Sequence, residues 1–152
     1  MAPTTIQTPQ ALLAAAAAGD PVELEAVLTV FDALPAVDVE AMIGEWDGTI
    51  VRTGHRGEGR LAQLGWVGKT FRAPDDVDPI VGHDAAGERV ANPVLGAASL
   101  RRVEYRGITT ATMIYDGHPI LDHFRALDAD TVLGLMDAKG DDEPLAFLLR
   151  RV

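Results

Sequence analysis

The chain has 152 residues, with 13 basic and 23 acidic side chains and a formal net charge of −10. This length is typical of a single domain, and an apolar content of 47% is enough to bury a core. The charge disfavours nucleic-acid binding, because each phosphate contact needs a cation from the protein. The absence of cysteine excludes disulfides, thiolate zinc sites and cysteine nucleophiles.

Residues 1–38 are predicted to form a helical N-terminal segment. Thr8-Pro9 is a helix-start signal followed by good helix formers up to Gly19, and Asp20-Pro21 repeats the signal for a second helix that ends at Pro35. The alanine-rich run has no basic residue before it and is too short to cross a bilayer. We therefore expect no secretory signal and no membrane span, with the cytoplasm as the default location.

Residues 39–152 are predicted to form a lipocalin-like β-barrel. Period-two alternation and short turn signals predict strands over 46–52, 66–72, 80–83, 89–91, 99–106, 108–115, 118–127, 131–137 and 145–152. Asp116-Gly117 predicts a two-residue type I′ hairpin turn, and Arg106-Gly107 predicts another tight reversal. The late connections are too short for crossover helices, so the fold class is mainly β. We expect an antiparallel up-and-down barrel of eight or nine strands, with the helices packed outside it or across one end.

A short motif, Gly44-Glu45-Trp46-Asp47-Gly48, leads into the first predicted strand. It resembles the motif of the GXWXG domain family, and segments 64–71 and 113–124 resemble that family and the domain of unknown function that accompanies it. The resemblance extends over residues 35–152. It implies a bacterial, calycin-type barrel in which the motif tryptophan packs across the closed end, and it assigns no activity.

Motifs for catalysis or metal binding are weak. The single serine, Ser99, lacks a glycine elbow, so no catalytic residue is nominated. The four histidines show no metal-ligand spacing, so no metal site is nominated. Some calycin barrels bind haem through one histidine, and His123 would be the candidate here; otherwise no cofactor is expected.

Polar residues on the predicted strands are the candidates for ligand contact. Asp122 and His123 must point to opposite faces of their strand, so a polar partner, water or ligand is expected on whichever face lines the lumen. Arg102 belongs to an arginine cluster that forms either outer ion pairs or a cationic wall for a carboxylate or phosphate head group. The expected ligand-binding residues are Trp66, Lys69, Arg102, Tyr115, His123 and Arg125.

These features predict a non-catalytic intracellular protein that binds a small amphipathic or anionic molecule, such as a fatty acid or anionic lipid, in the barrel lumen. The acidic balance does not oppose an anionic ligand, because residues 1–40 carry a net −6 and residues 41–152 only −4. One alternative is an isomerase or hydratase that uses His123 with Asp122 or Asp137 as acid–base groups. Another is an interaction module that docks through the acidic helices.

Overall fold

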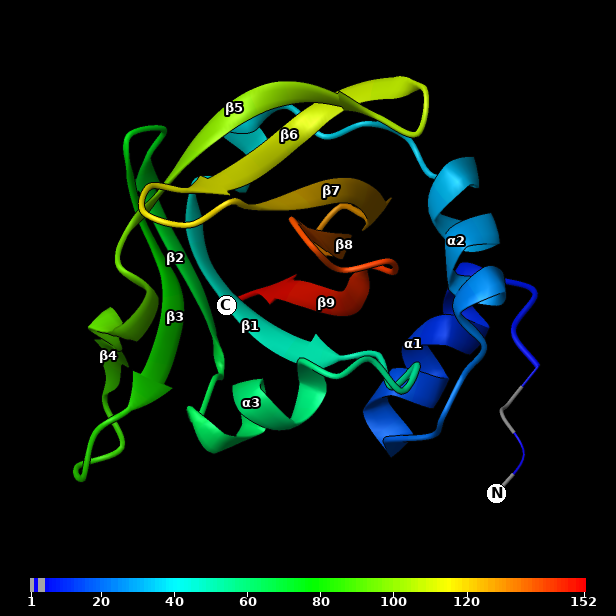
Figure 1. Cartoon of the computed structure of the whole chain (residues 1–152), viewed down its shortest axis with the longest axis horizontal. Coiled ribbons are helices and arrows are strands. Elements are labelled where there is room, and N and C mark those ends of the chain that lie inside the picture. The colour runs from blue at the N-terminus through cyan, green and yellow to red at the C-terminus, as the bar shows by residue number, and fades with distance from the viewer. Residues whose placement is uncertain (1, 3–4) are drawn as a thin grey trace.

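The structure, a computed structural model, describes residues 2 and 5–152, over which the chain forms nine strands and a few short helices (Figure 1). The helices are α1 (Pro9–Ala18), α2 (Leu24–Ala33), α3 (Glu58–Gln63) and two 3₁₀ turns, η1 (Val39–Met42) and η2 (Pro93–Leu95). The strands are β1 (Gly44–Ile50), β2 (Gly68–Ala73), β3 (Asp76–His83), β4 (Arg89–Ala91), β5 (Ala98–Tyr105), β6 (Ile108–Tyr115), β7 (Ile120–Asp128), β8 (Thr131–Ala138) and β9 (Leu145–Arg151).

Eight of these strands close into an antiparallel barrel. They follow chain order around the ring, β1-β2-β3-β5-β6-β7-β8-β9, and β9 pairs back onto β1. The short strand β4 extends the sheet from β3 and lies beside the ring. The prediction of a mainly β, up-and-down barrel with a helical N-terminal segment is confirmed.

One of the two predicted hairpin turns is confirmed and the other is wrong. Arg106 and Gly107 both have positive φ, 51° and 83°, as a two-residue type I′ turn requires. The prediction of a two-residue turn at Asp116-Gly117 is wrong, because β6 ends at Tyr115 and β7 begins only at Ile120. A two-residue turn there would place Pro119 inside the β6–β7 ladder, where it has no N–H to donate.

Helix α1 begins and ends where the sequence predicts, whereas the second helix begins later. The Thr8 side chain caps α1 by accepting from the Ala11 amide, and Gly19 ends the helix in the left-handed conformation at φ 70°. The second helix begins at Leu24, later than expected from Asp20-Pro21. The reason is that the Val22 amide donates to the Arg52 carbonyl at 2.9 Å, which holds this segment extended.

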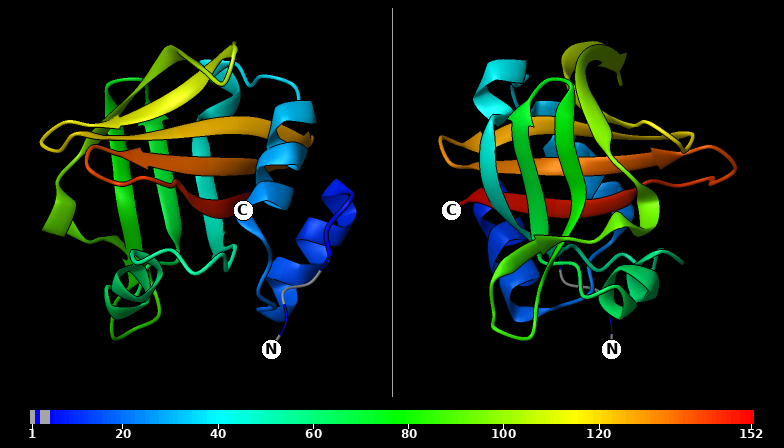
Figure 2. Two further views of the ribbon diagram at one scale, coloured as in Figure 1. Left: turned by 45° about the vertical axis from the view of Figure 1, so that its right-hand side comes forward. Right: turned by 90° about the vertical axis from the view of Figure 1, so that its left-hand side faces the viewer.

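Helices α1 and α2 lie outside the barrel, against one wall (Figure 2). Their apolar side chains and the outward-facing ones of β8 and β9 form a core of their own, separate from the core inside the barrel. The outer core includes Leu12, Val27 and Phe31 from the helices and Leu133, Leu135, Ala146 and Leu148 from the strands. The strands in this wall are therefore apolar on both faces.

The chain after α2 completes the barrel wall between β6 and β7. The Ala126 amide donates to the Pro35 carbonyl and the Ala111 amide to the Val37 carbonyl, both at 2.9 Å. Thr110 on β6 links this segment to β7, because its Oγ1 accepts from the Val37 amide at 3.0 Å and donates to the Phe124 carbonyl. Residues 35–37 thus satisfy backbone groups that β6 and β7 leave unpaired where they diverge.

Replacing Thr110 by valine is expected to lower the free energy of unfolding by about 1–3 kcal/mol, because it leaves buried backbone groups without a partner. The matched control is Thr109→Val on the same strand, where the side chain is exposed and the cost should be within about 0.5 kcal/mol. Urea denaturation of both variants measures the difference. Equal losses would show that the Thr110 hydroxyl does not hold the wall together.

Candidate functional site

The inside of the barrel contains a buried ion pair. Lys69 on β2 and Asp122 on β7 face each other across the lumen, with 3.1 Å between Nζ and Oδ2 and side chains only 3% and 2% exposed. Lys69 Nζ also donates to the Pro79 carbonyl at 3.1 Å. Such a pair is expensive to bury, because desolvation of both charges opposes their attraction.

Aromatic rings surround the ammonium group. Lys69 Nζ lies 5.3 Å from the ring centre of Phe147, 5.6 Å from that of Trp66 and 5.9 Å from that of Tyr115. Trp66 and Phe147 meet edge to face at 5.8 Å. We call the rings of Trp66, Tyr115 and Phe147 the aromatic cage. Their faces are electron-rich, so the cage favours a cation at Nζ or a polarised ligand beside it.

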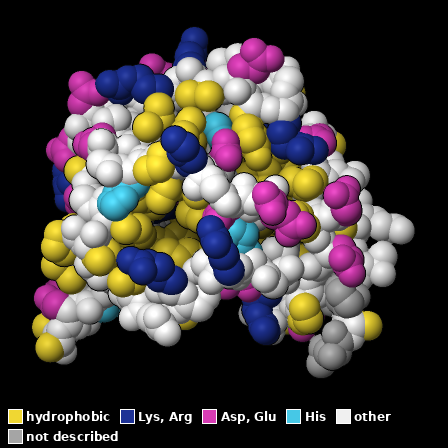
Figure 3. Space-filling model, viewed as in Figure 1, with side chains coloured by type: hydrophobic (Ala, Val, Ile, Leu, Met, Phe, Trp, Pro, Cys, Tyr) yellow, Lys and Arg dark blue, Asp and Glu magenta, His cyan; other side chains and the backbone are white. Residues whose placement is uncertain are grey.

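The cage borders a small cavity of about 10 Å³, the space of roughly one water molecule. The side chains around it are Leu61, Trp66, Lys69, Tyr115, Asp122, Met136, Leu145 and Phe147. On the face of the molecule seen in Figure 3 the surface is hollowed over the barrel, with apolar side chains in the hollow and basic and histidine side chains beside it.

Two polar atoms on the side chains that line this cavity are buried without a hydrogen-bond partner among the described residues: Trp66 Nε1 and Asp122 Oδ1. The other tryptophan differs, because Trp46 Nε1 donates to the Met42 carbonyl at 2.8 Å. An unpaired donor and an unpaired acceptor in one cavity are costly unless something binds them.

Burial also shifts the ionisation of the acidic groups in the lumen. Desolvation raises the pKa of Asp122 above its usual value, and the charge and hydrogen bond of Lys69 oppose that shift. Desolvation, helped by the charge of Asp122, raises the pKa of Tyr115 well above its usual value. Titratable groups perturbed in this way and gathered in one cavity are typical of functional sites.

Two glycines make room for the aromatic cage. A Cβ on Gly48 would lie 2.2 Å from the Trp66 ring, and a Cβ on Gly134 would lie 2.4 Å from the Phe147 ring. The second glycine of the G-x-W-x-G motif therefore seats a tryptophan outside the motif. The motif tryptophan, Trp46, is 1% exposed and packs under the Arg151 guanidinium at 4.3 Å.

Comparison with known proteins places the chain in a family. Residues 29–87 match the model described as GXWXG protein, and residues 96–151 match a domain of unknown function, DUF4334. The chain is similar over 95% of its length to a protein from Thermomonospora curvata whose crystal structure is known, with 40% identity, 97% of that chain covered and a TM-score of 0.89. The chain belongs to the GXWXG family. No curated protein matches it.

The six residues predicted to bind ligand fall into two groups in this GXWXG-family protein. Trp66, Lys69 and Tyr115 come together around the lumen cavity. Arg102, His123 and Arg125 do not line it. Arg102 is exposed on β5, with its guanidinium 3.5 Å from the carboxylate of Asp38.

His123 lies on the outer face of β7, opposite in direction to Asp122, as strand alternation requires. Its ring stacks on Tyr105 at 3.8 Å, and Nδ1 lies 3.0 Å from Thr112 Oγ1. Burial lowers the pKa of His123, and the nearby Asp137 opposes that shift. The lumen residues do not fit haem, because no histidine borders the cavity among the described residues and its volume is far too small.

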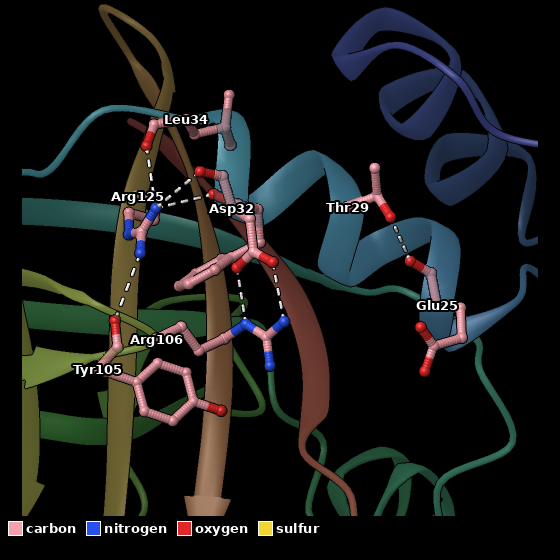
Figure 4. Close-up of polar contacts among 8 residues, drawn as sticks. Glu25, Thr29, Asp32, Leu34, Tyr105, Arg106 and Arg125 are labelled. Atoms are coloured by element: carbon pink, nitrogen blue, oxygen red, sulfur yellow. Dashed lines mark hydrogen bonds and ion pairs between the residues drawn. The ribbon is translucent and has the colours of Figure 1, made fainter.

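Arg125 anchors helix α2 to the barrel (Figure 4). Its guanidinium donates to the carbonyls of Phe31 at 3.0 Å and Leu34 at 3.1 Å and stacks over the Phe31 ring. A cation at the C-terminal end of a helix also complements its dipole. Beside it, Arg106 makes a two-pronged ion pair with Asp32. Arg106 and Arg125 therefore attach the N-terminal segment to the barrel, and their guanidinium groups are engaged in these contacts.

The sequence missed two members of the site. Asp122 was expected to need a polar partner, water or ligand if its face lined the lumen, or to act as an acid–base group, but neither it nor Phe147 is among the six predicted ligand-binding residues. The alternation of β7, with Asp122 next to Phe124 on one face, was the signal that could have placed Asp122 inside. For Phe147, no signal in the strand distinguished the inner from the outer face, because 145–149 is apolar throughout.

The described residues of this family member form neither a group of metal-ligating side chains nor a membrane-crossing helix. No three His, Asp or Glu side chains among them gather around a common point for a metal ion. No helix formed by the described residues is long and apolar enough to cross a bilayer.

Replacing Gly48 by alanine is expected to push the Trp66 ring out of its seat and to destabilise the fold by about 1–3 kcal/mol. The control is Gly59→Ala in α3, where nothing lies within 4 Å of the added carbon and the helix gains propensity. Thermal unfolding and the indole NMR signal of Trp66 report the two effects. A Gly48→Ala protein with wild-type stability and an unshifted Trp66 signal would contradict this account of the motif.

Proposed function

We propose that the barrel lumen binds a small amphipathic molecule, whose polar head contacts the Lys69–Asp122 pair and whose apolar body lies among the cage rings. The observation that supports this most is the unpaired donor of Trp66 and the unpaired acceptor of Asp122 on one buried cavity. A ligand with both an acceptor and a donor would satisfy the two atoms at once. Retaining an ion pair in an apolar lumen is costly, and binding specificity is one use that repays it.

The charge of the site favours a neutral head group over an anionic one. Lys69 is already neutralised by Asp122 at 3.1 Å, so a carboxylate or phosphate would meet the carboxylate as well as the ammonium. The other cations expected near the ligand, Arg102, His123 and Arg125, lie away from the cavity. An anionic head therefore remains the weaker form of the proposal.

The volume of the cavity limits the size of the ligand. A space of about 10 Å³ does not hold a fatty-acid chain, so the ligand has few non-hydrogen atoms or displaces side chains on entry. Leu61 and Met136 border the cavity and are partly exposed. Met136 is unbranched and adapts easily, which makes this edge of the cage the route of entry.

We expect titration with butyramide to shift the indole NMR signal of Trp66 and to leave that of Trp46 in place. Trp66 Nε1 is free to donate to the amide oxygen, whereas Trp46 Nε1 is held by the Met42 carbonyl and serves as a control within the same spectrum. Butyrate, with the same carbon chain and a negative head, is expected to bind at least about tenfold more weakly, a difference of about 1.4 kcal/mol.

The variant that tests the contacts is Lys69→Met with Asp122→Leu, which keeps the lumen filled and removes both polar heads. It should no longer respond to butyramide. The proposal fails if butyramide leaves Trp66 unshifted in the wild-type protein, or if the double variant responds as strongly as the wild type.

A further inference from the structure

Lys69 is placed to act as an amine nucleophile as well as a binding group. Its Nζ has two polar partners among the described residues, Asp122 Oδ2 and the Pro79 carbonyl. A neutral amine has two hydrogens and one lone pair. When the proton passes to Asp122 Oδ2 the lone pair faces Asp122, and rotation about the Cε–Nζ bond turns it toward the cavity while one hydrogen donates to the Pro79 carbonyl. Lysines desolvated in apolar pockets are a known type of enzymic nucleophile.

Asp122 is placed to take up the proton that the amine must lose. The carboxylate oxygen that accepts from Nζ lies 3.1 Å away, so the proton can move along an existing hydrogen bond. The transfer leaves two neutral groups in place of two buried charges, which offsets part of the lost attraction between the ammonium group and the rings. Burial raises the pKa of Asp122, which acts in the same direction. Its second oxygen, Oδ1, has no partner among the described residues.

We propose that Lys69 forms an imine with a small aldehyde or ketone bound in the lumen, with Asp122 as the acid–base group. This inference rests on the proposed function, because the carbonyl compound occupies the same cavity as the amphipathic ligand. Both residues are catalytic in the strict sense, since Nζ becomes bonded to the ligand and the Asp122 carboxyl group exchanges protons with the reacting atoms.

The step balances with the groups present. The Nζ lone pair attacks the carbonyl carbon, and the carbonyl oxygen takes the proton from the Asp122 carboxylic acid. Asp122 then takes a proton from the nitrogen and returns it to the hydroxyl group, which leaves as water while the nitrogen lone pair forms the C=N bond. The products are a protonated imine on Lys69, a carboxylate on Asp122 beside it, and one water molecule.

The cage would stabilise the charged product and select the ligand. The protonated imine occupies the place of the ammonium, within the same ring of Trp66, Tyr115 and Phe147 and next to the same carboxylate. Because the cavity of about 10 Å³ holds only about one water molecule, a carbonyl compound must displace side chains on entry, which favours short, unbranched compounds over bulky ones.

The test uses butanal with sodium cyanoborohydride, which reduces an imine to a stable butylamine, followed by peptide mass mapping. The chain has two lysines, so exposed Lys139 is a control in every experiment. We expect Lys69 to be butylated at least about tenfold faster than Lys139 despite its burial, and Asp122→Asn to slow Lys69 by about tenfold or more without changing Lys139. Excess butyramide should protect Lys69 alone.

The outcomes separate this inference from the function it rests on. If butyramide shifts Trp66 but butanal modifies Lys139 and leaves Lys69 unmodified, the lumen binds ligand and the imine chemistry is refuted. If Asp122→Asn, with an unshifted Trp46 signal to show that it is folded, reacts at Lys69 as fast as the wild type, the role of Asp122 is refuted. Butylation of Lys69 in a protein that does not bind butyramide would uphold the chemistry and refute the neutral-head ligand.

Discussion

The ion pair between Lys69 and Asp122 is the constraint on which the lumen depends. Two charged groups inside an apolar barrel need each other, and further contacts hold the ammonium group: the Pro79 carbonyl that accepts from Nζ and the three rings around it. A barrel built for stability alone would fill this space with apolar side chains, because replacing a buried ion pair in that way is often neutral or stabilising. The pair is therefore the main argument for the ligand binding that we propose.

The surrounding fold positions this pair through close packing at a few points. Gly48 and Gly134 leave the space that the rings of Trp66 and Phe147 occupy. The second glycine of the family motif is therefore needed to seat Trp66 in the cage, in addition to the role of the motif in placing Trp46. The N-terminal segment contributes from outside. Residues 35–37 complete the wall where β6 and β7 diverge, and Arg125 fixes the end of α2 to that wall. The N-terminal segment thus stabilises the barrel wall from outside.

The sequence predicted the strands well and the faces of the strands poorly, for a physical reason. Alternation and turn signals are local, and they located all nine strands and the turn at Arg106-Gly107. The choice of which face points inward depends on polar residues facing water, and that rule fails here because α1 and α2 cover one wall. Arg125 is consequently buried under α2 on the outer side, and His123 is buried there against the Tyr105 ring, while the charged Asp122 lies inside. Helix α3 went unpredicted because it is six residues long and buries none of them.

The unfolding free energies of Lys69→Met, Asp122→Leu and the double variant distinguish a pair that serves a ligand from one that serves the stability of the barrel. If the pair serves a ligand, each single variant loses about 3–5 kcal/mol by leaving one buried charge unpaired, and the double variant recovers to at least wild-type stability. If the double variant is instead as unstable as the sum of the two single variants, the pair holds the barrel together and does not serve a ligand.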